Sequence, residues 1–351
     1  MLPIRKCVEQ TSGYIPGEQP QTNDFTKLNT NENPYPPPLE IFEGLQQELA
    51  KIRLYPDPVS TKLREAAAKV FGVSPVNILA GNGSDDILNI AVRTFVNPGE
   101  TVTFLDLTYS LYETIAGVHG ASIIKIPTND RFAINQPIIC PKAKLIFIAS
   151  PNPPVGQHLN RDYLEETCER ATGIVLIDEA YADFSDENHL DFLTKYDNVI
   201  ISRTMSKSYS IAGMRVGFGI ASIPIIEQMN KVKDSYNLDR IAQLLGTNAL
   251  NFQEYFKEIW QKVRQTRSHL IESLKALDFL VFDSDSNFVF ASSQWIPASE
   301  LYKKLKERKV LVRYFKNPRI KDYIRISVGT DQEIAQLLQT INEIKFSLGL
   351  S

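Results

Sequence analysis

A lysine in a loop rich in hydroxyl residues is the first candidate for chemistry in this sequence. Lys207 lies within VIISRTMSKSYSIAGMRVGFGIAS, residues 199–222, between two apolar runs typical of short buried strands. Residues 204–215 are therefore predicted to form a loop at the edge of a sheet. The hydroxyl groups around Lys207, together with the cation of Arg215, would suit an anion such as a phosphate monoester. A solvated surface loop explains these residues equally well, because lysines in serine-rich loops are common.

A glycine-containing loop is the second candidate, in the stretch GNGSDD that begins at residue 81. Its glycines let the backbone approach an anion, and a helix N-terminus opened by the amides of Gly83, Ser84 and Asp85 favours phosphate. A tight turn that needs glycine is the alternative. ATP-binding and dinucleotide-binding loops are poor matches, since no Gly-Lys-Ser/Thr follows and Asp86 stands where a third glycine is needed.

Two further polar side chains follow predicted strands. Asp178 ends the apolar run GIVLID, and a carboxylate there needs a cation, hydrogen bonds or a metal. Helix capping is the alternative for Asp178. Asn152 lies in SPNPPVG, where prolines fix a rigid loop and hold the asparagine in one orientation. For that segment alone, a proline-rich turn is the better explanation.

Alternating apolar runs indicate the elements that must position these groups. Between residues 77 and 221, short apolar strands without polar alternation are separated by helical patterns, which predicts a mostly parallel sheet covered on both faces. Ligands in such folds bind at the carboxyl ends of the strands. The fold class is therefore α/β, with an extended arm of little regular structure over 1–37, a large domain over 38–237 and a smaller α+β domain over 238–351. Ser60 and Gly72 are expected to delimit one helix, and Thr330 with Glu333 predicts a capping box for the last.

Composition limits the partners. The chain has 351 residues, 43% of them apolar, with 38 Lys+Arg against 41 Asp+Glu, so no basic excess favours nucleic acid or an anionic membrane. The three cysteines are odd in number and far apart, which fits reduced thiols in the cytoplasm. The four histidines are isolated, and no metal site is predicted. No apolar run approaches the roughly 18 residues of a membrane span, so a soluble cytoplasmic protein is expected.

Eight motifs taken in order resemble the fold-type I pyridoxal-phosphate enzymes, the aspartate aminotransferase superfamily. Within it the chain is most similar to the histidinol-phosphate aminotransferases, over nearly its full length. The motifs are GYIPGEQP, LNTNENP, RLYPDP, LAGNGSDD, SPNPPVG, IDEAYADF, SKSYSIAGMRVGF and YIRISVGT. The resemblance implies a fold-type I large domain with a smaller C-terminal domain, pyridoxal 5'-phosphate as cofactor and a homodimer with shared active sites.

The resemblance also implies a role for each matching residue. Lys207 would hold the cofactor as a Schiff base and move the proton, and Asp178 would pair with the protonated pyridine nitrogen. The other implied cofactor contacts are Tyr181 and Asn152 at the ring hydroxyl, Tyr109 on the ring face, Gly83, Ser84, Asp85, Ser206 and Arg215 at the phosphate, and Tyr55 at the phosphate from the other subunit. The assignment of Asn152 departs from the family pattern, because Pro153 replaces a second asparagine that is usual in this loop.

Three residues resemble those that grip the acidic end of the substrate: Tyr14, Arg313 and Arg325. Arg325 would fork onto a carboxylate in any amino-acid aminotransferase, whereas Tyr14 and Arg313 would favour a phosphate. An exposed arginine is the alternative for Arg313. The implied reaction exchanges an amino group between L-glutamate and imidazole-acetol phosphate. An aromatic or other amino-acid aminotransferase and a decarboxylase of a phosphorylated amino acid are the alternatives.

Overall fold

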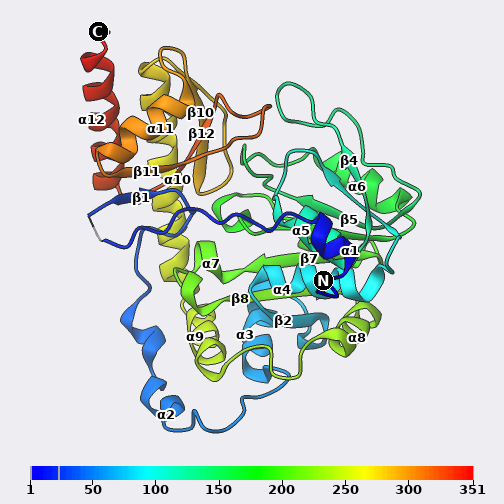
Figure 1. Cartoon of the computed structure of the whole chain (residues 1–351). Helices are drawn as coiled ribbons and strands as arrows, with labels where there is room; N and C mark the ends of the chain where they lie inside the picture. Colours follow the sequence, from blue (N-terminus) through cyan, green and yellow to red (C-terminus); the bar gives the residue numbers. More distant parts are fainter. Residues whose placement is uncertain (1, 23, 351) are drawn as a thin grey trace.

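The computed structural model describes residues 2–22 and 24–350, which form two β-sheets and the helices that cover them (Figure 1). The larger sheet has seven strands in the order β2-β8-β7-β6-β5-β3-β4. These strands are β2 (Ile78–Asn82), β3 (Thr101–Leu105), β4 (Ser122–Ile126), β5 (Ala143–Ala149), β6 (Ile174–Asp178), β7 (Val199–Thr204) and β8 (Val216–Ala221). Strand β8 runs antiparallel to both of its neighbours, and the remaining pairs are parallel. The predicted mostly parallel α/β sheet is confirmed.

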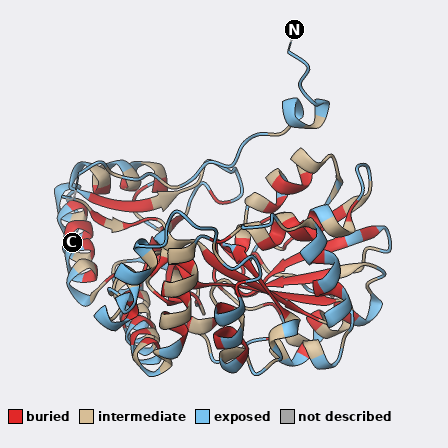
Figure 2. Cartoon of the chain, turned by 90° about the horizontal axis from the view of Figure 1, so that it is seen from below, coloured by how far each residue is buried: buried red, intermediate tan, exposed pale blue. Residues whose placement is uncertain are grey.

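Helices cover both faces of this sheet, and the central strands are mostly buried, with β7 and β8 buried at every residue (Figure 2). Helices α4 (Ser84–Phe95), α5 (Leu111–His119) and α8 (Ile223–Val232) pack on one face. Helices α3 (Thr61–Phe71), α6 (Arg161–Arg170) and α9 (Arg240–Asn251) pack on the other. Successive strand residues alternate between the two cores, as with Leu145 and Ile146, which is why the strands read as continuous apolar runs.

The smaller sheet has five strands in the order β1-β11-β12-β10-β9. Its strands are β1 (Thr26–Leu28), β9 (Phe279–Val281), β10 (Phe288–Ser293), β11 (Val310–Tyr314) and β12 (Ile324–Ser327). Helices α10 (Gln253–Ala276), α11 (Ala298–Glu307) and α12 (Asp331–Ser347) pack against it. This sheet with its helices is the smaller α+β unit expected near the C-terminus.

The N-terminal arm contains more regular structure than the sequence predicted. Its first helix is α1 (Lys6–Gln10), and its strand β1 pairs in parallel with β11, from Thr26 opposite Val310 to Leu28 opposite Val312. Without β1, strand β11 would be the edge of the small sheet and would present unpaired backbone groups, which β1 satisfies. The arm is thereby built into the small sheet.

The chain crosses from the core of the large sheet to the core of the small sheet at a later position than residue 237, the predicted boundary. Helix α9 lies beyond that boundary, yet Ala242 and Leu250 belong to the core under the large sheet. Helix α10 makes the connection, since Phe256 near its start joins the large core and Leu270 joins the small one. From the sequence alone, the long helical stretch did not indicate where the core of the large sheet ends.

Helix ends agree with the predicted signals with one exception. Thr330 and Glu333 form the expected capping box, and Gly72 ends α3 in the left-handed conformation. The side chain of Ser60 makes no cap bond; Asp57 instead accepts from the backbone N–H of Thr61 at 2.7 Å. The predicted loop over 204–215 contains two short turns of helix, α7 (Met205–Ser208) and η5 (Ala212–Met214).

The segment after the arm leaves most of its apolar side chains in solvent, although Ile41 is buried. It comprises η1 (Leu39–Phe42) and α2 (Leu45–Leu49), and it projects from the body of the chain in Figure 1. Leu39 is 81% exposed and Ile52 67%. The remaining short elements are η2 (Pro75–Asn77), η3 (Ala182–Phe184) and η4 (Leu190–Thr194). Within residues 2–22 and 24–350, no helix is both long enough and apolar enough to span a membrane.

Candidate active site

The carboxyl ends of β6 and β7 bring two of the predicted site residues to one edge of the large sheet. Asp178 is the last residue of β6, and it pairs in register with Ser202 of the neighbouring β7. Lys207 follows β7 on the short helix α7, which begins at the next residue after the strand. Parallel strands end at the same edge, so the acid and the amine face a common space.

The amine of Lys207 is held in surroundings that favour its neutral form. Its Nζ donates to the backbone oxygen of Thr30, 3.2 Å away, so the N-terminal arm closes over the lysine. Burial, together with the nearby cation of Arg325, lowers the pKa of Lys207 to about 8. A neutral amine is a nucleophile and a base, so Lys207 is suited to covalent chemistry near neutral pH.

Asp178 is a buried carboxyl group with only one of its oxygens satisfied. Oδ2 accepts a hydrogen bond from the hydroxyl of Tyr112 at 2.8 Å, whereas Oδ1 is buried without a hydrogen-bond partner among the described residues. Burial raises the pKa of Asp178 to about 7. An unpaired buried oxygen of this kind is suited to a cationic N–H of a bound group.

Tyr112 was not identified from the sequence. Its ring is fully buried and stacks on Phe147, with ring centroids 4.7 Å apart. The helical spacing that places it on the buried face of α5 reads as ordinary core packing. Its hydroxyl group is the only hint of another role.

Tyr181 lies three residues beyond Asp178, after the strand ends. Its ring packs edge-on against Phe288 of β10, with centroids 5.1 Å apart. Its hydroxyl oxygen accepts a hydrogen bond from Nδ2 of Asn31 at 3.1 Å. Burial raises the pKa of Tyr181, so it stays protonated and can donate.

Five predicted residues form an anion-binding cradle around the start of α4. Gly83 precedes the helix with a φ of 79°, and Ser84 and Asp85 are its first residues, whose N–H groups have no carbonyl partner inside the helix. Arg215 donates to Oγ of Ser206 at 2.9 Å and to Oδ2 of Asp85 at 3.1 Å. A cation, a hydroxyl group and a helix N-terminus therefore meet at one place, as binding of a phosphate requires.

Tyr109 and Tyr14 lie beside this cradle. The hydroxyl of Tyr109 donates to Oδ1 of Asp85 at 3.2 Å, and Tyr14 of the arm packs edge-on against the Tyr109 ring at 5.9 Å. Burial, reinforced by the carboxylate of Asp85, raises the pKa of Tyr109. A neutral aromatic face bordered by an arm residue is suited to stacking against a flat ring.

The side chain of Asn152 is turned toward the loop that follows β3. Its Oδ1 accepts from Thr108 at 2.6 Å, and its Nδ2 donates to the backbone oxygen of Leu107 at 2.9 Å. The second N–H of the amide and one lone pair of its oxygen are left for other partners. The ring contact expected of Asn152 stays a prediction, and the structure gives this residue a role in holding the loop.

Two arginines lie opposite one another where β11 and β12 pair. Arg313 and Arg325 are partners in the register of these strands, and the guanidinium groups lie 5.6 and 5.8 Å from the ring of Phe315. Arg325 donates to the backbone oxygen of Asn29 at 3.3 Å, and its buried Nε lacks a partner among the residues described. A buried cation with free donors is an anion site.

Arg313 is engaged with the arm. Its two terminal nitrogens donate to the backbone oxygens of Pro16 and Ile15, each at 3.1 Å. In this arrangement, the same guanidinium that was predicted to bind substrate fastens the segment that carries Tyr14. No sequence pattern predicts this link, because backbone carbonyl groups are present in every segment.

Within its own chain, Tyr55 lies apart from the other residues predicted to bind the cofactor. It follows the projecting α2 segment, is 76% exposed and stacks on Tyr236 with centroids 4.3 Å apart. A phenol ring this exposed is free to meet a second molecule. Its predicted place at the phosphate of the other subunit stays a prediction.

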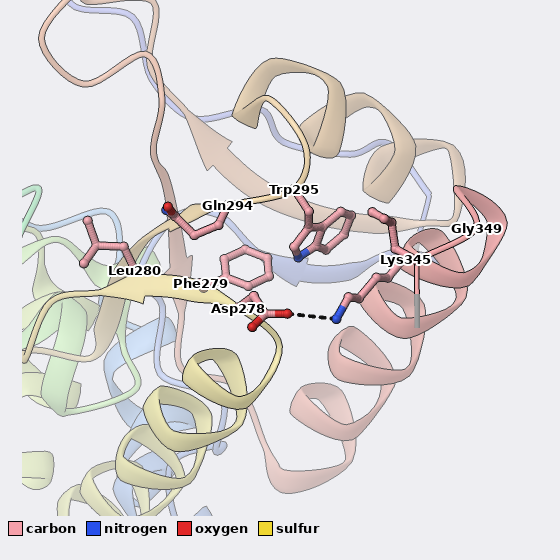
Figure 3. Close-up of a pocket in the computed structure, with 8 residues that line it drawn as sticks. Asp278, Phe279, Leu280, Gln294, Trp295, Lys345 and Gly349 are labelled. Carbon is pink, nitrogen blue, oxygen red and sulfur yellow. Dashed lines mark hydrogen bonds and ion pairs between the residues drawn. The ribbon is translucent and has the colours of Figure 1, made fainter.

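A separate pocket of about 730 Å³ lies in the small unit, away from these residues (Figure 3). The side chains of Phe279 and Trp295 form its apolar part, and Lys345 reaches Asp278 at 3.0 Å beside them. Other lining residues include Leu280, Gln294, Gly349 and Leu350. It contains none of the predicted site residues.

The chain matches known proteins along nearly its whole length. A family model described as aminotransferase class I and II matches residues 23–341. A histidinol-phosphate aminotransferase from Rippkaea orientalis is 79% identical, with 99% of this chain and 100% of the relative covered. A histidinol-phosphate aminotransferase from Citrifermentans bemidjiense is 40% identical, with 98% and 99% covered.

Solved structures share the fold at low sequence identity. A putative histidinol-phosphate aminotransferase from Erwinia carotovora atroseptica has a TM-score of 0.84 at 22% identity, covering 96% of this chain and 99% of that one. The Sinorhizobium meliloti histidinol-phosphate aminotransferase in complex with pyridoxal-5'-phosphate has a TM-score of 0.82 at 24%, covering 92% and 91%. An L-threonine-O-3-phosphate decarboxylase from Porphyromonas gingivalis reaches 0.78 at 19%, covering 91% and 98%, so these likenesses establish the fold alone.

Proposed function

The chain belongs to the class I and II aminotransferase family, and we propose that it transfers the amino group between L-glutamate and imidazole-acetol phosphate, which yields L-histidinol phosphate and 2-oxoglutarate. Relatives named histidinol-phosphate aminotransferase that are 64–79% identical over almost the full chain support this choice. The alternatives share the cofactor, so the substrate must be argued from the site.

The residues present fit pyridoxal 5'-phosphate. The observation that carries this fit is the buried Oδ1 of Asp178, which lacks a partner among the described residues and suits a protonated pyridine nitrogen. The cradle at Gly83, Ser206 and Arg215 suits the phosphate group. When bound, pyridoxal phosphate acts as an electron sink that makes the proton next to the amino group of the substrate removable.

The chain's own residues supply the remaining chemistry. We assign Lys207 the proton transfer, because its buried amine has a lowered pKa and is held by the backbone oxygen of Thr30. Asp178 holds a cationic ring nitrogen by charge and by Oδ1. The Tyr109 ring supports the flat face of the cofactor, and Tyr181 donates to the ring hydroxyl oxygen.

We assign the acidic end of the substrate to Arg325 and Arg313. A phosphate monoester carries nearly two negative charges and three acceptor oxygens, so it can engage two guanidinium groups, whereas a carboxylate is largely satisfied by one fork. The register of β11 and β12 sets these two residues side by side. Tyr14 belongs to the arm segment that Arg313 holds and packs against Tyr109, so it would close the pocket over the substrate.

We further propose that the enzyme works as a cytoplasmic homodimer. Cys7, Cys140 and Cys168 are free thiols in the structure. The exposed apolar residues between Leu39 and Tyr55 are suited to cover by a second copy, which would also bring Tyr55 to a partner site.

A half-reaction with purified holoenzyme tests the proposed function. Adding L-histidinol phosphate without an oxo acid should convert the bound cofactor to its aminated form, with loss of its visible absorption band and release of imidazole-acetol phosphate. Aromatic amino acids should react more slowly. Release of carbon dioxide from a phosphorylated amino acid, without amination of the cofactor, would identify the decarboxylase instead.

The variant Lys207→Ala tests the assignment directly, because Lys207 is assigned the proton transfer for each of the candidate reactions. The variant should still bind the cofactor through the phosphate cradle, but its turnover should fall by roughly 10²- to 10⁴-fold or more. Transamination by the alanine variant at the wild-type rate contradicts the whole assignment.

A further inference from the structure

A short arm segment, residues 29–33, lies across the candidate site and contacts it at nearly every residue. The contacts in order are the Asn29 oxygen with Arg325, the Thr30 oxygen with Lys207, the Asn31 side chain with Tyr181 and the Asn33 side chain with the Ser208 oxygen. Three of these four involve residues already assigned to the reaction. The segment therefore forms a wall of the site, and its side chains have no assigned role so far.

Asn31 is the most restrained residue of this wall. It is 1% exposed and adopts the left-handed conformation, with a φ of 56°. Its backbone N–H donates to Oγ of Ser327 at 2.8 Å, and its backbone oxygen accepts from Nδ2 of Asn287 at 2.9 Å. Ser327 ends β12 and Asn287 directly precedes β10, so the small sheet fixes the backbone of Asn31 before its side chain is considered.

The Asn31 amide presents its carbonyl end to Ser327 and its NH₂ end to Tyr181. Oγ of Ser327 accepts from the Asn31 backbone N–H, and its own hydrogen donates to Oδ1 of Asn31, 3.0 Å away. In this orientation the Ser327 hydroxyl hydrogen and one N–H of the amide each have an acceptor. Nδ2 donates to the Tyr181 hydroxyl oxygen at 3.1 Å.

This orientation decides what Tyr181 can do. Its oxygen already accepts from Asn31, so its single hydrogen must be donated elsewhere, and the site is the side left open. Asn152 has its carbonyl oxygen and one N–H engaged by the 107–108 loop, and Pro153 has no side-chain donor. Tyr181 is thus the donor best placed for the ring hydroxyl oxygen of a bound cofactor.

We propose that Asn31 is a positioning residue that fixes the Tyr181 hydroxyl group as a hydrogen-bond donor to the ring oxygen of pyridoxal phosphate. This inference rests on the proposed cofactor site, but it does not depend on which amine is the substrate. It also explains why an asparagine stands at a left-handed position, because Asn tolerates this conformation and supplies a donor and an acceptor in one side chain.

Two substitutions separate the donor from the backbone conformation. Asn31→Asp keeps the shape and the acceptor for Ser327, but its carboxylate accepts from Tyr181 and takes the hydrogen away from the cofactor. Asn31→Gly removes the side chain and keeps the left-handed backbone accessible. Tyr181→Phe removes the donor itself and provides the reference.

The readout is the pH at which the visible absorption of bound cofactor changes, measured on each holoenzyme without substrate. A hydrogen bond donated to the ring oxygen stabilises its anionic form, so losing the donor should raise this transition. A bond to a charged group contributes about 1.5–3 kcal/mol, so both Asn31 variants and Tyr181→Phe should shift the transition upward by about one pH unit or more.

Two comparisons exclude a merely structural role. Adding Asn31→Gly to Tyr181→Phe should shift the transition no further, because Asn31 acts through the tyrosine hydroxyl group. Asn287→Ala loosens the same backbone but leaves the amide with Tyr181, so it should lower Tm and keep the wild-type transition. Wild-type transitions in both Asn31 variants, additive shifts, or an equal shift in Asn287→Ala would each overturn the inference. Failure to react with histidinol phosphate, with these shifts present, would overturn only the proposed substrate.

Discussion

Several residues in this site are buried polar groups that lack some of their hydrogen-bond or charge partners. Asp178 has one free oxygen, Lys207 has a lowered pKa, and Arg325 keeps a buried Nε without a partner among the residues described. Each arrangement costs free energy in the chain alone, because buried polar groups are stable only when paired. A cofactor and substrate with complementary charges would supply the missing partners.

The cost of Asp178 can be measured through the pH dependence of stability. Its pKa is raised from 3.8 to about 7 by burial, so in the cofactor-free protein the neutral acid is the favoured form. Because the pKa is raised in the folded state, the contribution of the neutral Asp178 to folding stability is fully present below pH 4 and is lost as the pH rises toward 7. Asp178→Asn has no charge to bury, so its Tm should match that of the wild type near pH 4 and exceed it above pH 7. The corresponding gain in unfolding free energy is at most about 4 kcal/mol.

The same substitution should act in the opposite direction on activity. An amide cannot neutralise a protonated pyridine nitrogen, so turnover by the Asp178→Asn holoenzyme should fall by orders of magnitude while the fold is kept. Thermal scans of the cofactor-free proteins and steady-state assays of the holoenzymes measure the two effects. Normal activity would favour the explanation in which Asp178 has a structural role at the strand end.

Arg313 should determine preference between the two substrates. If a charge-assisted contact contributes about 1.5–3 kcal/mol, Arg313→Ala should reduce kcat/KM for histidinol phosphate by roughly 10- to 100-fold. The loss for glutamate should be smaller, because Arg325 alone can fork onto a carboxylate. Arg313→Lys keeps the charge but loses the bidentate geometry, so its kcat/KM for histidinol phosphate should lie between those of the wild type and Arg313→Ala. Equal losses for both substrates would point to the arm contacts with Ile15 and Pro16 as the main role.

The phosphate cradle depends on close approach between secondary-structure elements. Strand β8 pairs with β2 and places Gly217 directly against the loop that starts α4. A Cβ atom on Gly217 would lie 2.4 Å from backbone atoms of Gly83 and Ser84. Backbone atoms cannot move aside as a flexible side chain can, so the glycine allows the helix N-terminus to sit where it does.

Gly217→Ala should therefore displace the start of α4 and weaken binding of pyridoxal phosphate. Cofactor affinity, measured by fluorescence titration of the cofactor-free protein, should fall markedly, with a lower Tm. Gly213→Ala is the matched control in the same stretch, because a Cβ there meets nothing within 4 Å. If both variants bind the cofactor as the wild type does, the close approach does not shape the cradle.

In the molecule as a whole, the projecting segment from Leu39 to Tyr55 is the feature that supports the proposed homodimer. Its apolar side chains repeat with helical spacing, yet Leu39 is 81% and Tyr55 76% exposed. Contiguous exposed apolar surface is typical of an interface, and a two-fold axis would place the same segment of each copy on the other.

Hybrid dimers test whether each active site needs both subunits. Lys207→Ala and Tyr55→Ala proteins, each of low activity, should regain roughly a quarter of wild-type activity when mixed equally and allowed to exchange, since half the dimers are hybrids with one intact site. The control mixture is Lys207→Ala with Asp178→Asn. Both of these residues belong to one chain's site, so that mixture should regain nothing. No recovery in the first mixture, with hybrids shown to form, would place Tyr55 outside the partner site.

The α/β class, the mostly parallel sheet and the α+β unit near the C-terminus could be predicted from the amino-acid sequence. These follow from local signals, because strand and helix periodicity, the Gly72 stop and the Thr330 capping box are each contained within a few neighbouring residues. It also marked Lys207 and Asp178, since a charged residue after an apolar run stands out without a structure. The family resemblance supplied their expected roles.

The contacts between groups far apart in the sequence could be identified only from the three-dimensional structure. The bond from Tyr112 to Asp178, the hold of Arg313 on the arm and the contact of Asn31 with Tyr181 join residues that are 66, 297 and 150 positions apart. Strand β1 joined the small sheet, and α9 the large core, for the same reason. Such pairings depend on how backbone groups and apolar faces are buried together over the whole chain, and no local pattern encodes them.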